Sequence, residues 1–258
     1  MAIHPSAVVD ASVRVPESCT IGPFCLVGPE VEMGERCELM SHVVLEGPTR
    51  MGSDNHIFPF ASIGLGPQDL TFKGEPTRLV IGDDNAIREF VTIHRGTVKG
   101  GGVTTIGSHT LLMAYTHVAH DCRVGDWVIM ANAATLAGHV NVEHHAVVGA
   151  LCAVHQFVNV GEYSYIGGGT IITQDVLPFS KTSATRDVHC YGANSIGLER
   201  RGFSSERVRK IQHAFRVLLA SKLNTSQALE QLRSEGDPGE DVETLIRFIE
   251  ASSRGVLK

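Results

Sequence analysis

An aliphatic residue recurs at every sixth position through most of this chain. The series runs from Ile3 to Ile63, resumes from Ile81 to Ile93 and continues from Ile106 to Ile172. We call each of these aliphatic residues a mark. In most intervals a small or β-branched residue stands four positions after the mark, and Gly often follows the mark directly. Six residues of strand and turn span about 20 Å, so three such sides close a triangular coil of about 18 residues. The pattern predicts a parallel β-helix with the aliphatic marks in its interior.

Two interruptions of this register predict loops extruded from the prism. Residues 66–78 lack the pattern, and residues 97–105 contain a Lys followed by three consecutive Gly. Loops on a regular scaffold are where functional side chains concentrate. We therefore expect both segments to border a functional site.

The six-residue period ends near Pro178, and after Arg201 the apolar spacing becomes helical. Ser204 or Ser205 is expected to cap a helix that ends near Ser221. A second helix is expected to start at Thr225, and a third to run over about 241–252. We predict two domains: an all-β left-handed parallel β-helix over residues 1–190, and a small α-helical C-terminal domain over residues 191–258. The spacing alone does not set the handedness, which rests on the resemblance described below.

Composition excludes several classes of protein. The net charge of −6 disfavours a nucleic-acid partner. The first residues contain neither a basic region nor a long apolar run, so no signal peptide is expected, and no stretch approaches the roughly 20 apolar residues of a membrane span. The six Cys form no CxxC pair and fit the small positions of the core. We expect reduced cysteines and a cytoplasmic protein.

Four histidines occupy positions that the register stacks near one edge of the prism. They come from three successive coils, namely His117, His120, His139 and His155. Residues on neighbouring coils of a solenoid can serve one elongated site. His4, His42, His56, His109, His144 and His145 are instead expected to be solvated surface residues.

The neighbours of these four histidines indicate acid–base chemistry. A neutral imidazole such as that of His120 can act as general base near neutral pH. Asp121 follows it directly and can orient the ring or stabilise its cation. Gly138 leaves a backbone N–H open to close approach, as an oxyanion donor requires.

The sequence resembles the UDP-N-acetylglucosamine O-acyltransferases that open lipid A biosynthesis. The matching stretches span nearly the whole chain: IGPF (21–24), SHVV (41–44), QDL (68–70), GEPTR (74–78), TIHRGT (92–97), HVAHDC (117–122), TLAGHV (135–140), VHQF (154–157) and RRGFS (200–204). The resemblance implies a left-handed β-helix, a homotrimer with active sites between subunits, and no metal or cofactor. It also implies transfer of a 3-hydroxyacyl group from acyl carrier protein to the glucosamine 3-hydroxyl of UDP-N-acetylglucosamine.

By the same resemblance, His120 matches the catalytic base and Gly138 the backbone oxyanion donor, with Asp121 beside the base. Gly168 matches the position that limits acyl length, and a Gly there implies that a longer chain is accepted. The substrate-contact region corresponds to Asp69, Thr71, Lys73, His117, His139, His155, Gln156, Asn194, Arg200 and Arg201. Within it, Thr71 replaces the lysine usual in the family, and Lys73 is at most a partial substitute.

Three alternatives remain open at this stage. Because Thr71 and Ile196 depart from the family pattern, a 3-amino UDP-sugar is a possible acceptor. The histidines could instead hold zinc, as in the trimeric β-helices of the γ-class carbonic anhydrases. A non-catalytic scaffold is the third interpretation.

The helical tail also carries Arg207, Arg209, Lys210 and Arg216, which could dock an acidic carrier protein or could form only a solvated helix face.

Overall fold

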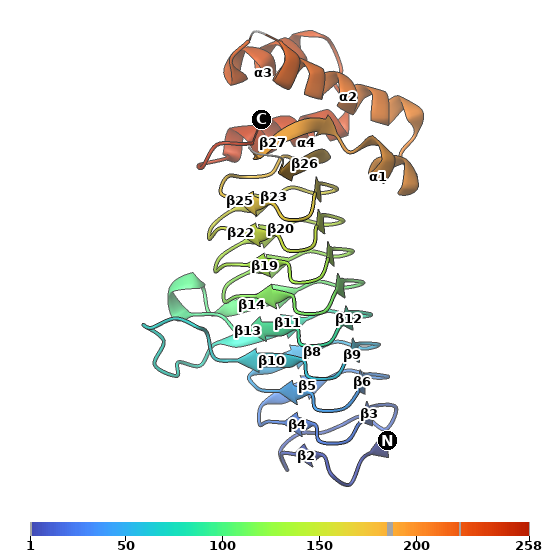
Figure 1. Cartoon of the computed structure of the whole chain (residues 1–258), viewed down its shortest axis with the longest axis vertical. Coiled ribbons are helices and arrows are strands. Elements are labelled where there is room, and N and C mark those ends of the chain that lie inside the picture. Colours follow the sequence, from blue (N-terminus) through green and yellow to red (C-terminus); the bar gives the residue numbers. More distant parts are fainter. Residues whose placement is uncertain (1, 185–187, 222, 258) are drawn as a thin grey trace.

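The computed structural model describes residues 2–184, 188–221 and 223–257. It is the expected left-handed parallel β-helix, a three-sided prism with helices stacked over its C-terminal end (Figure 1). The strands are two to six residues long and belong to three sheets, here called A, B and C. Consecutive strands of one sheet come from successive coils, so each sheet forms one side of the prism.

Sheet A contains β1 (Ala2–Ile3), β3 (Thr20–Ile21), β6 (Glu38–Leu39), β9 (His56–Ile57), β12 (Ala86–Ile87), β15 (Leu111–Leu112), β18 (Ile129–Met130), β21 (Val147–Val148), β24 (Tyr165–Ile166), β26 (Ser180–Ala184) and β27 (Val188–Ala193). Sheet B contains β2 (Val8–Val9), β4 (Leu26–Val27), β7 (Val44–Leu45), β10 (Ser62–Leu65), β13 (Thr92–His94), β16 (His117–Val118), β19 (Thr135–Leu136), β22 (Ala153–Val154) and β25 (Ile171–Ile172). Sheet C contains β5 (Val31–Met33), β8 (Thr49–Met51), β11 (Arg78–Ile81), β14 (Val103–Ile106), β17 (Arg123–Val124), β20 (Asn141–Val142) and β23 (Asn159–Val160). Only the hairpin of β26 and β27 is antiparallel among these described pairs.

The aliphatic marks of the six-residue register fill the prism interior. Leu39, Ile63 and Leu136 are fully buried, and the marks of successive coils pair in register, as Val118 does with Leu136. The six cysteines are free and buried, which confirms that they serve as small core groups. The core is therefore a column of stacked side chains, and each coil depends on its two neighbours.

Both predicted excursions leave the prism at the edge between sheets B and C. The first connects β10 to β11, and the second connects β13 to β14 through the 3-10 helix η1 (Val98–Gly100). They project side by side from one edge (Figure 1). β14 already begins at Val103, inside the range expected for the second excursion, because residues 103–106 pair with residues 78–81 of β11.

The helices follow the expected order, with one addition. Ser204 caps α2 (Ser205–Ala220), as predicted, and α3 (Thr225–Ser234) and α4 (Glu240–Ala251) match the other two expected helices. The short helix α1 (Ser195–Arg200) was not predicted. These helices share a second buried hydrophobic cluster with the end of the prism. The predicted domain boundary at residue 190 falls inside β27 of the β26–β27 hairpin, and it stays a prediction. Within the described ranges, no helix is long and apolar enough to cross a membrane.

Two adjacent isoleucines of β25 give a matched test of the prism core. Ile172 is fully buried, whereas Ile171 is 64% exposed. We expect Ile172→Ala to lower the free energy of unfolding by about 2–5 kcal/mol, because it removes buried methyl groups and leaves a cavity. Ile171→Ala should cost no more than about 0.5 kcal/mol. Urea unfolding of both variants checks this, and equal losses would contradict the assignment of the interior.

Candidate active site

A histidine–aspartate pair lies at the edge between sheets B and C. Nδ1 of His120 is 2.8 Å from Oδ2 of Asp121, and the Asp121 side chain is fully buried. Nε2 of His139 lies 3.7 Å from the same carboxylate oxygen. The rings of His120 and His139 meet edge to face, with centroids 5.2 Å apart. The predicted gathering of histidines from neighbouring coils is therefore present for this pair.

The Asp121 carboxylate also binds the second excursion through two hydrogen bonds. The backbone N–H of Thr97 donates to Oδ1 over 2.8 Å, and the Thr97 hydroxyl donates to Oδ2 over 2.6 Å. A Cβ on Gly100 would lie 2.0 Å from the Asp121 carboxyl carbon, so only Gly allows the segment to pack this closely. Asp121 thus holds the imidazole of His120 and the loop at once.

Gly138 lies against the His120 imidazole. A Cβ at this position would come within 2.6 Å of Cε1 and 2.9 Å of Nε2 of His120. Within the described part of the chain its backbone N–H has no hydrogen-bond acceptor, while its carbonyl accepts from Phe157. A free amide beside the imidazole is the arrangement that an oxyanion donor needs.

His117 and His94 form a second, more buried pair next to His120. Their ring centroids are 5.1 Å apart, and Nδ1 of His117 lies 2.7 Å from the Thr92 hydroxyl. Burial, and then the nearby charges of His117 and His120, lowers the pKa of His94 to about 4. Burial and then His120 also lower the pKa of His117. Both rings are therefore neutral near pH 7. His94 was not singled out from the sequence, although it lies within the TIHRGT stretch.

The remaining predicted residues of this edge lie in separate surroundings. His155 is exposed, and its Nδ1 lies 3.4 Å from the Arg254 guanidinium, which also donates to the backbone carbonyl of Gln156. Phe157, rather than His155, stacks on His139, with centroids 4.5 Å apart. Gly168 lies between β24 and β25, at the edge between sheets A and B, where an added Cβ would meet the Ala150 carbonyl oxygen at 3.1 Å.

The first excursion contributes Asp69, Thr71 and Lys73. The backbone N–H and the hydroxyl of Thr71 both donate to Oδ1 of Asp69, over 2.8 and 2.9 Å. These bonds, followed by the charges of His120 and Lys99, lower the pKa of Asp69. The charge of Lys73 acts instead on Glu75, whose carboxylate accepts from the Lys73 backbone N–H.

Asn194, Arg200 and Arg201 lie on another side of the prism. They line a cavity of about 750 Å³ together with residues of sheet A such as Tyr165 and Lys181. Asn194 caps α1. His145, which was expected to be solvated, is half-buried in this cavity, with Nδ1 2.6 Å from the Arg201 guanidinium. That expectation was wrong for His145, because the chain after the last coil folds back onto sheet A.

The possible metal ligands differ from a three-histidine set. Among the described residues, one group brings three such side chains together, namely His120, Asp121 and His139, with ligand atoms within 4.8 Å of one another. His117 and His155 are not members. Because Asp121 is already bound by Thr97 and His120, the geometry resembles a hydrogen-bonded catalytic pair more than a three-histidine zinc centre.

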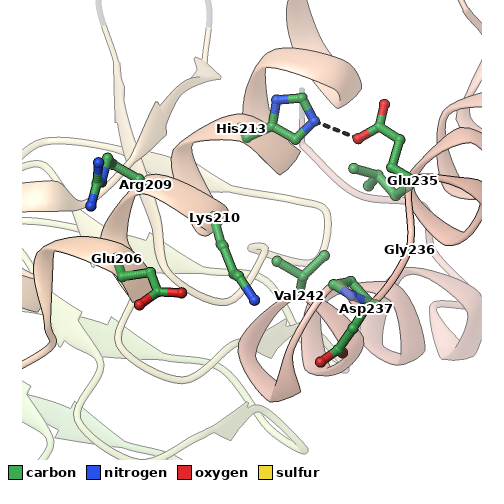
Figure 2. A pocket seen from close by; sticks show the side chains of 10 residues that line it. Glu206, Arg209, Lys210, His213, Glu235, Gly236, Asp237 and Val242 are labelled. Atoms are coloured by element: carbon green, nitrogen blue, oxygen red, sulfur yellow. Dashed lines mark hydrogen bonds and ion pairs between the residues drawn. The ribbon is translucent and has the colours of Figure 1, made fainter.

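A second cavity, of about 500 Å³, lies in the helical end, far from the His120 edge. Figure 2 shows Lys210 of α2 extending toward the segment that carries Glu235 and Asp237, whereas Arg209 of the same helix points away from it. His213 is bonded to Glu235 over 2.5 Å. Arg207 is paired with Asp241. Charges of both signs are therefore mixed here, and the surface is not a uniformly basic face.

A hexapeptide-repeat prism with a histidine–aspartate pair at one edge defines the class of hexapeptide transferases. A family model for the bacterial transferase hexapeptide (six repeats) matches residues 103–138, and one for UDP N-acetylglucosamine O-acyltransferase, domain 2, matches residues 175–257. The acyl-[acyl-carrier-protein]–UDP-N-acetylglucosamine O-acyltransferases of Halorhodospira halophila and Alkalilimnicola ehrlichii are 48% and 49% identical, each over 99% of both chains. The chain belongs to this UDP-N-acetylglucosamine O-acyltransferase family.

Solved structures agree with this assignment over the full length. The Acinetobacter baumannii structure, a UDP-N-acetylglucosamine acyltransferase relative, has a TM-score of 0.95 at 42% identity and covers 100% of both chains. The UDP-N-acetylglucosamine acyltransferase of Francisella novicida also has a TM-score of 0.95, at 38% identity, over 99% of this chain and 93% of that one. The resemblance found in the sequence is confirmed.

The lowered pKa of His94 predicts an acid sensitivity. Between the ordinary histidine pKa and about 4, the unfolded chain binds a proton at His94 that the folded chain does not. The free energy of unfolding must therefore fall as the pH falls through this window. We expect His94→Asn to lose less stability than the wild type between about pH 7 and pH 5. Thermal unfolding at both pH values measures this, and His4→Asn, at an exposed residue of the first coil, is the control that should follow the wild type. Parallel curves for all three proteins would refute it.

Proposed function

We propose that this chain transfers a 3-hydroxyacyl group from acyl carrier protein to the 3-hydroxyl of UDP-N-acetylglucosamine, the first step of lipid A biosynthesis. Family membership over the full length supports the reaction class. The observation that carries the mechanism is the partly buried His120–Asp121 pair, 2.8 Å apart, with Gly138 beside it. Six free cysteines and the carrier-protein donor fit a cytoplasmic location.

In this mechanism His120 is the general base. Its Nδ1–H donates to Asp121, which leaves Nε2 as the acceptor. Nε2 takes the proton of the sugar 3-hydroxyl while that oxygen attacks the thioester carbonyl. The oxyanion accepts from the Gly138 N–H. Collapse breaks the C–S bond, and the leaving thiolate takes the proton back from His120. An ester forms, and the carrier protein is released with a free thiol.

The neighbours of His120 suit a base that becomes positively charged. Asp121 lies against the ring and stabilises the imidazolium. His117 and His94 have lowered pKa values, so they add no positive charge near pH 7. A cation that forms on His120 is therefore stabilised by the Asp121 carboxylate and is not opposed by charge on His94 or His117.

We further propose that the chain works as a homotrimer. The His120 group lies at the edge between sheets B and C, whereas Asn194, Arg200 and Arg201 line the cavity against sheet A. One acceptor that contacts both groups must lie between two copies of the chain. A ladder of exposed stacked rings along the edge between sheets A and B supports a buried partner surface, with Phe60, Phe90 and Tyr115 at centroid spacings of 4.8–5.0 Å.

In this assembly we assign the arginine cavity to the nucleotide. A volume of about 750 Å³ is adequate for a small ligand. Arg200 and Arg201 supply planar donors that match phosphate oxygens. Asn194 adds an amide at the same wall.

The catalytic assignment predicts the effect of removing the base. With 3-hydroxyacyl carrier protein and UDP-N-acetylglucosamine, we expect His120→Ala to lower kcat by about 100-fold or more. The exposed His4→Ala, in the first coil, should retain wild-type turnover. Ester formation is followed by mass spectrometry, with the 3-amino sugar nucleotide as a parallel acceptor. Product from the amino sugar alone would revise the acceptor. Full activity in His120→Ala would refute the base.

The absence of a side chain at Gly168 predicts acceptance of a longer acyl chain. Its backbone φ is not in the left-handed region, so a larger residue can be placed there once the Ala150 carbonyl oxygen, 3.1 Å from the added Cβ, shifts by a few tenths of an ångström. We expect Gly168→Met to shift the preference toward shorter 3-hydroxyacyl donors, because its side chain fills the groove, and Gly168→Ala to shift it less. Competition among donors of mixed length, read from the products, tests this. An unchanged length distribution in the Met variant would disprove the assignment.

A further inference from the structure

Lys99 occupies an unusual place, in a loop that is fixed directly to the catalytic pair. It lies in η1, between Thr97, which donates twice to Asp121, and Gly100, which packs against the same carboxylate. The backbone on either side of Lys99 is therefore held against the partner of His120. Its side chain is exposed and starts from a well-positioned backbone.

The Lys99 ammonium reaches across to the first excursion. Nζ donates to the Thr71 hydroxyl over 3.3 Å, and that hydroxyl donates to Oδ1 of Asp69. Close by, the Arg95 guanidinium lies over the Phe72 ring at 5.7 Å. The two excursions are thus in contact, and they bring a cation and a carboxylate together beside His120.

The contact of Lys99 with Thr71 leaves most of its donor capacity available. An ammonium has three N–H donors, and a 3.3 Å bond to a neutral hydroxyl at an exposed site uses one of them weakly. Asp69 in turn is an acceptor that is half-buried, and its lowered pKa keeps it ionised near neutral pH. A sugar hydroxyl both donates and accepts. A neighbouring ammonium and carboxylate therefore match the hydroxyls of a pyranose ring.

We infer that Lys99 is an acceptor-binding residue, which donates to hydroxyls of the sugar ring while Asp69 accepts from them. This inference rests on the proposed function. It places a cation beside Asp69 on a loop that Thr97 fixes to the Asp121 carboxylate. Lys73 interacts with Glu75 instead, and its backbone N–H and its charge lower the pKa of that carboxyl group. Lys99 orients the sugar, and His120 takes the proton from its 3-hydroxyl.

The test separates acceptor binding from turnover in the full-length enzyme. For Lys99→Gln we expect the KM for UDP-N-acetylglucosamine to rise by about 10-fold, the loss typical of a charged hydrogen bond, with kcat changed by no more than about threefold. The KM for the acyl donor should stay unchanged. Arg14→Gln, which removes one exposed positive charge in the N-terminal coils, is the matched control and should behave as the wild type.

A relocated lysine distinguishes binding from a structural role. Since Thr71 directly contacts the Lys99 ammonium, Thr71→Lys in the Lys99→Gln background should recover most of the acceptor affinity, measured both as KM and by calorimetric titration with UDP-N-acetylglucosamine. An acceptor KM within about twofold of wild type in Lys99→Gln, or an equal rise in the donor KM, would overturn the inference. Wild-type enzyme that forms no ester from UDP-N-acetylglucosamine would overturn the proposed function itself.

Discussion

The stacking of one aliphatic side chain from each side of each coil is the constraint on which the rest of this structure depends. Because these side chains must meet inside a narrow prism, the backbone has to turn after every few residues. Many corner residues adopt the left-handed conformation, among them Asp121 with φ of 60° and His139 with φ of 63°. This conformation is unfavourable for residues other than Gly, less so for Asp than for most. The packed column holds it in place.

The packing of the core determines where the side chains at the corners of the prism lie, and so it determines the geometry of the site. Corner residues of successive coils lie one above another, so His139 packs on Phe157 and lies one coil from Asp121. The distance between side chains at equivalent corners of neighbouring coils is then close to the spacing of neighbouring strands, about 4.8 Å. Rigid neighbours on both sides limit movement of the His120 ring. A solenoid thereby achieves the preorganisation that a loop-built site must obtain from many separate contacts.

This constraint also explains which features could be predicted from the sequence. The core marks, the buried cysteines and the meeting of His120 with His139 all follow from counting residues in a fixed register. Lys99, Arg254 and the Arg201–His145 contact do not, because their segments leave the register. The length of an excursion says that it projects, but the contacts of its side chains depend on where it folds back. His94 was missed for another reason: its role rests on burial, and histidine at that position has no periodic signal.

The coils on one hand, and the excursions with the helical end on the other, therefore carry different parts of the candidate site. The coils fix His120, Asp121 and Gly138, and the roles of base, carboxylate partner and oxyanion donor that we propose for them need accuracy of a fraction of an ångström. The excursions and the helical end carry Asp69, Lys99 and the arginines, and the substrate contacts that we propose for them tolerate more variation in position. Because the two groups lie on different sides of one chain, an acceptor that contacts both must lie between two copies in the proposed trimer. In that arrangement the spacing of the coils sets the geometry of the proposed catalytic pair, and assembly brings the proposed substrate-binding residues to it.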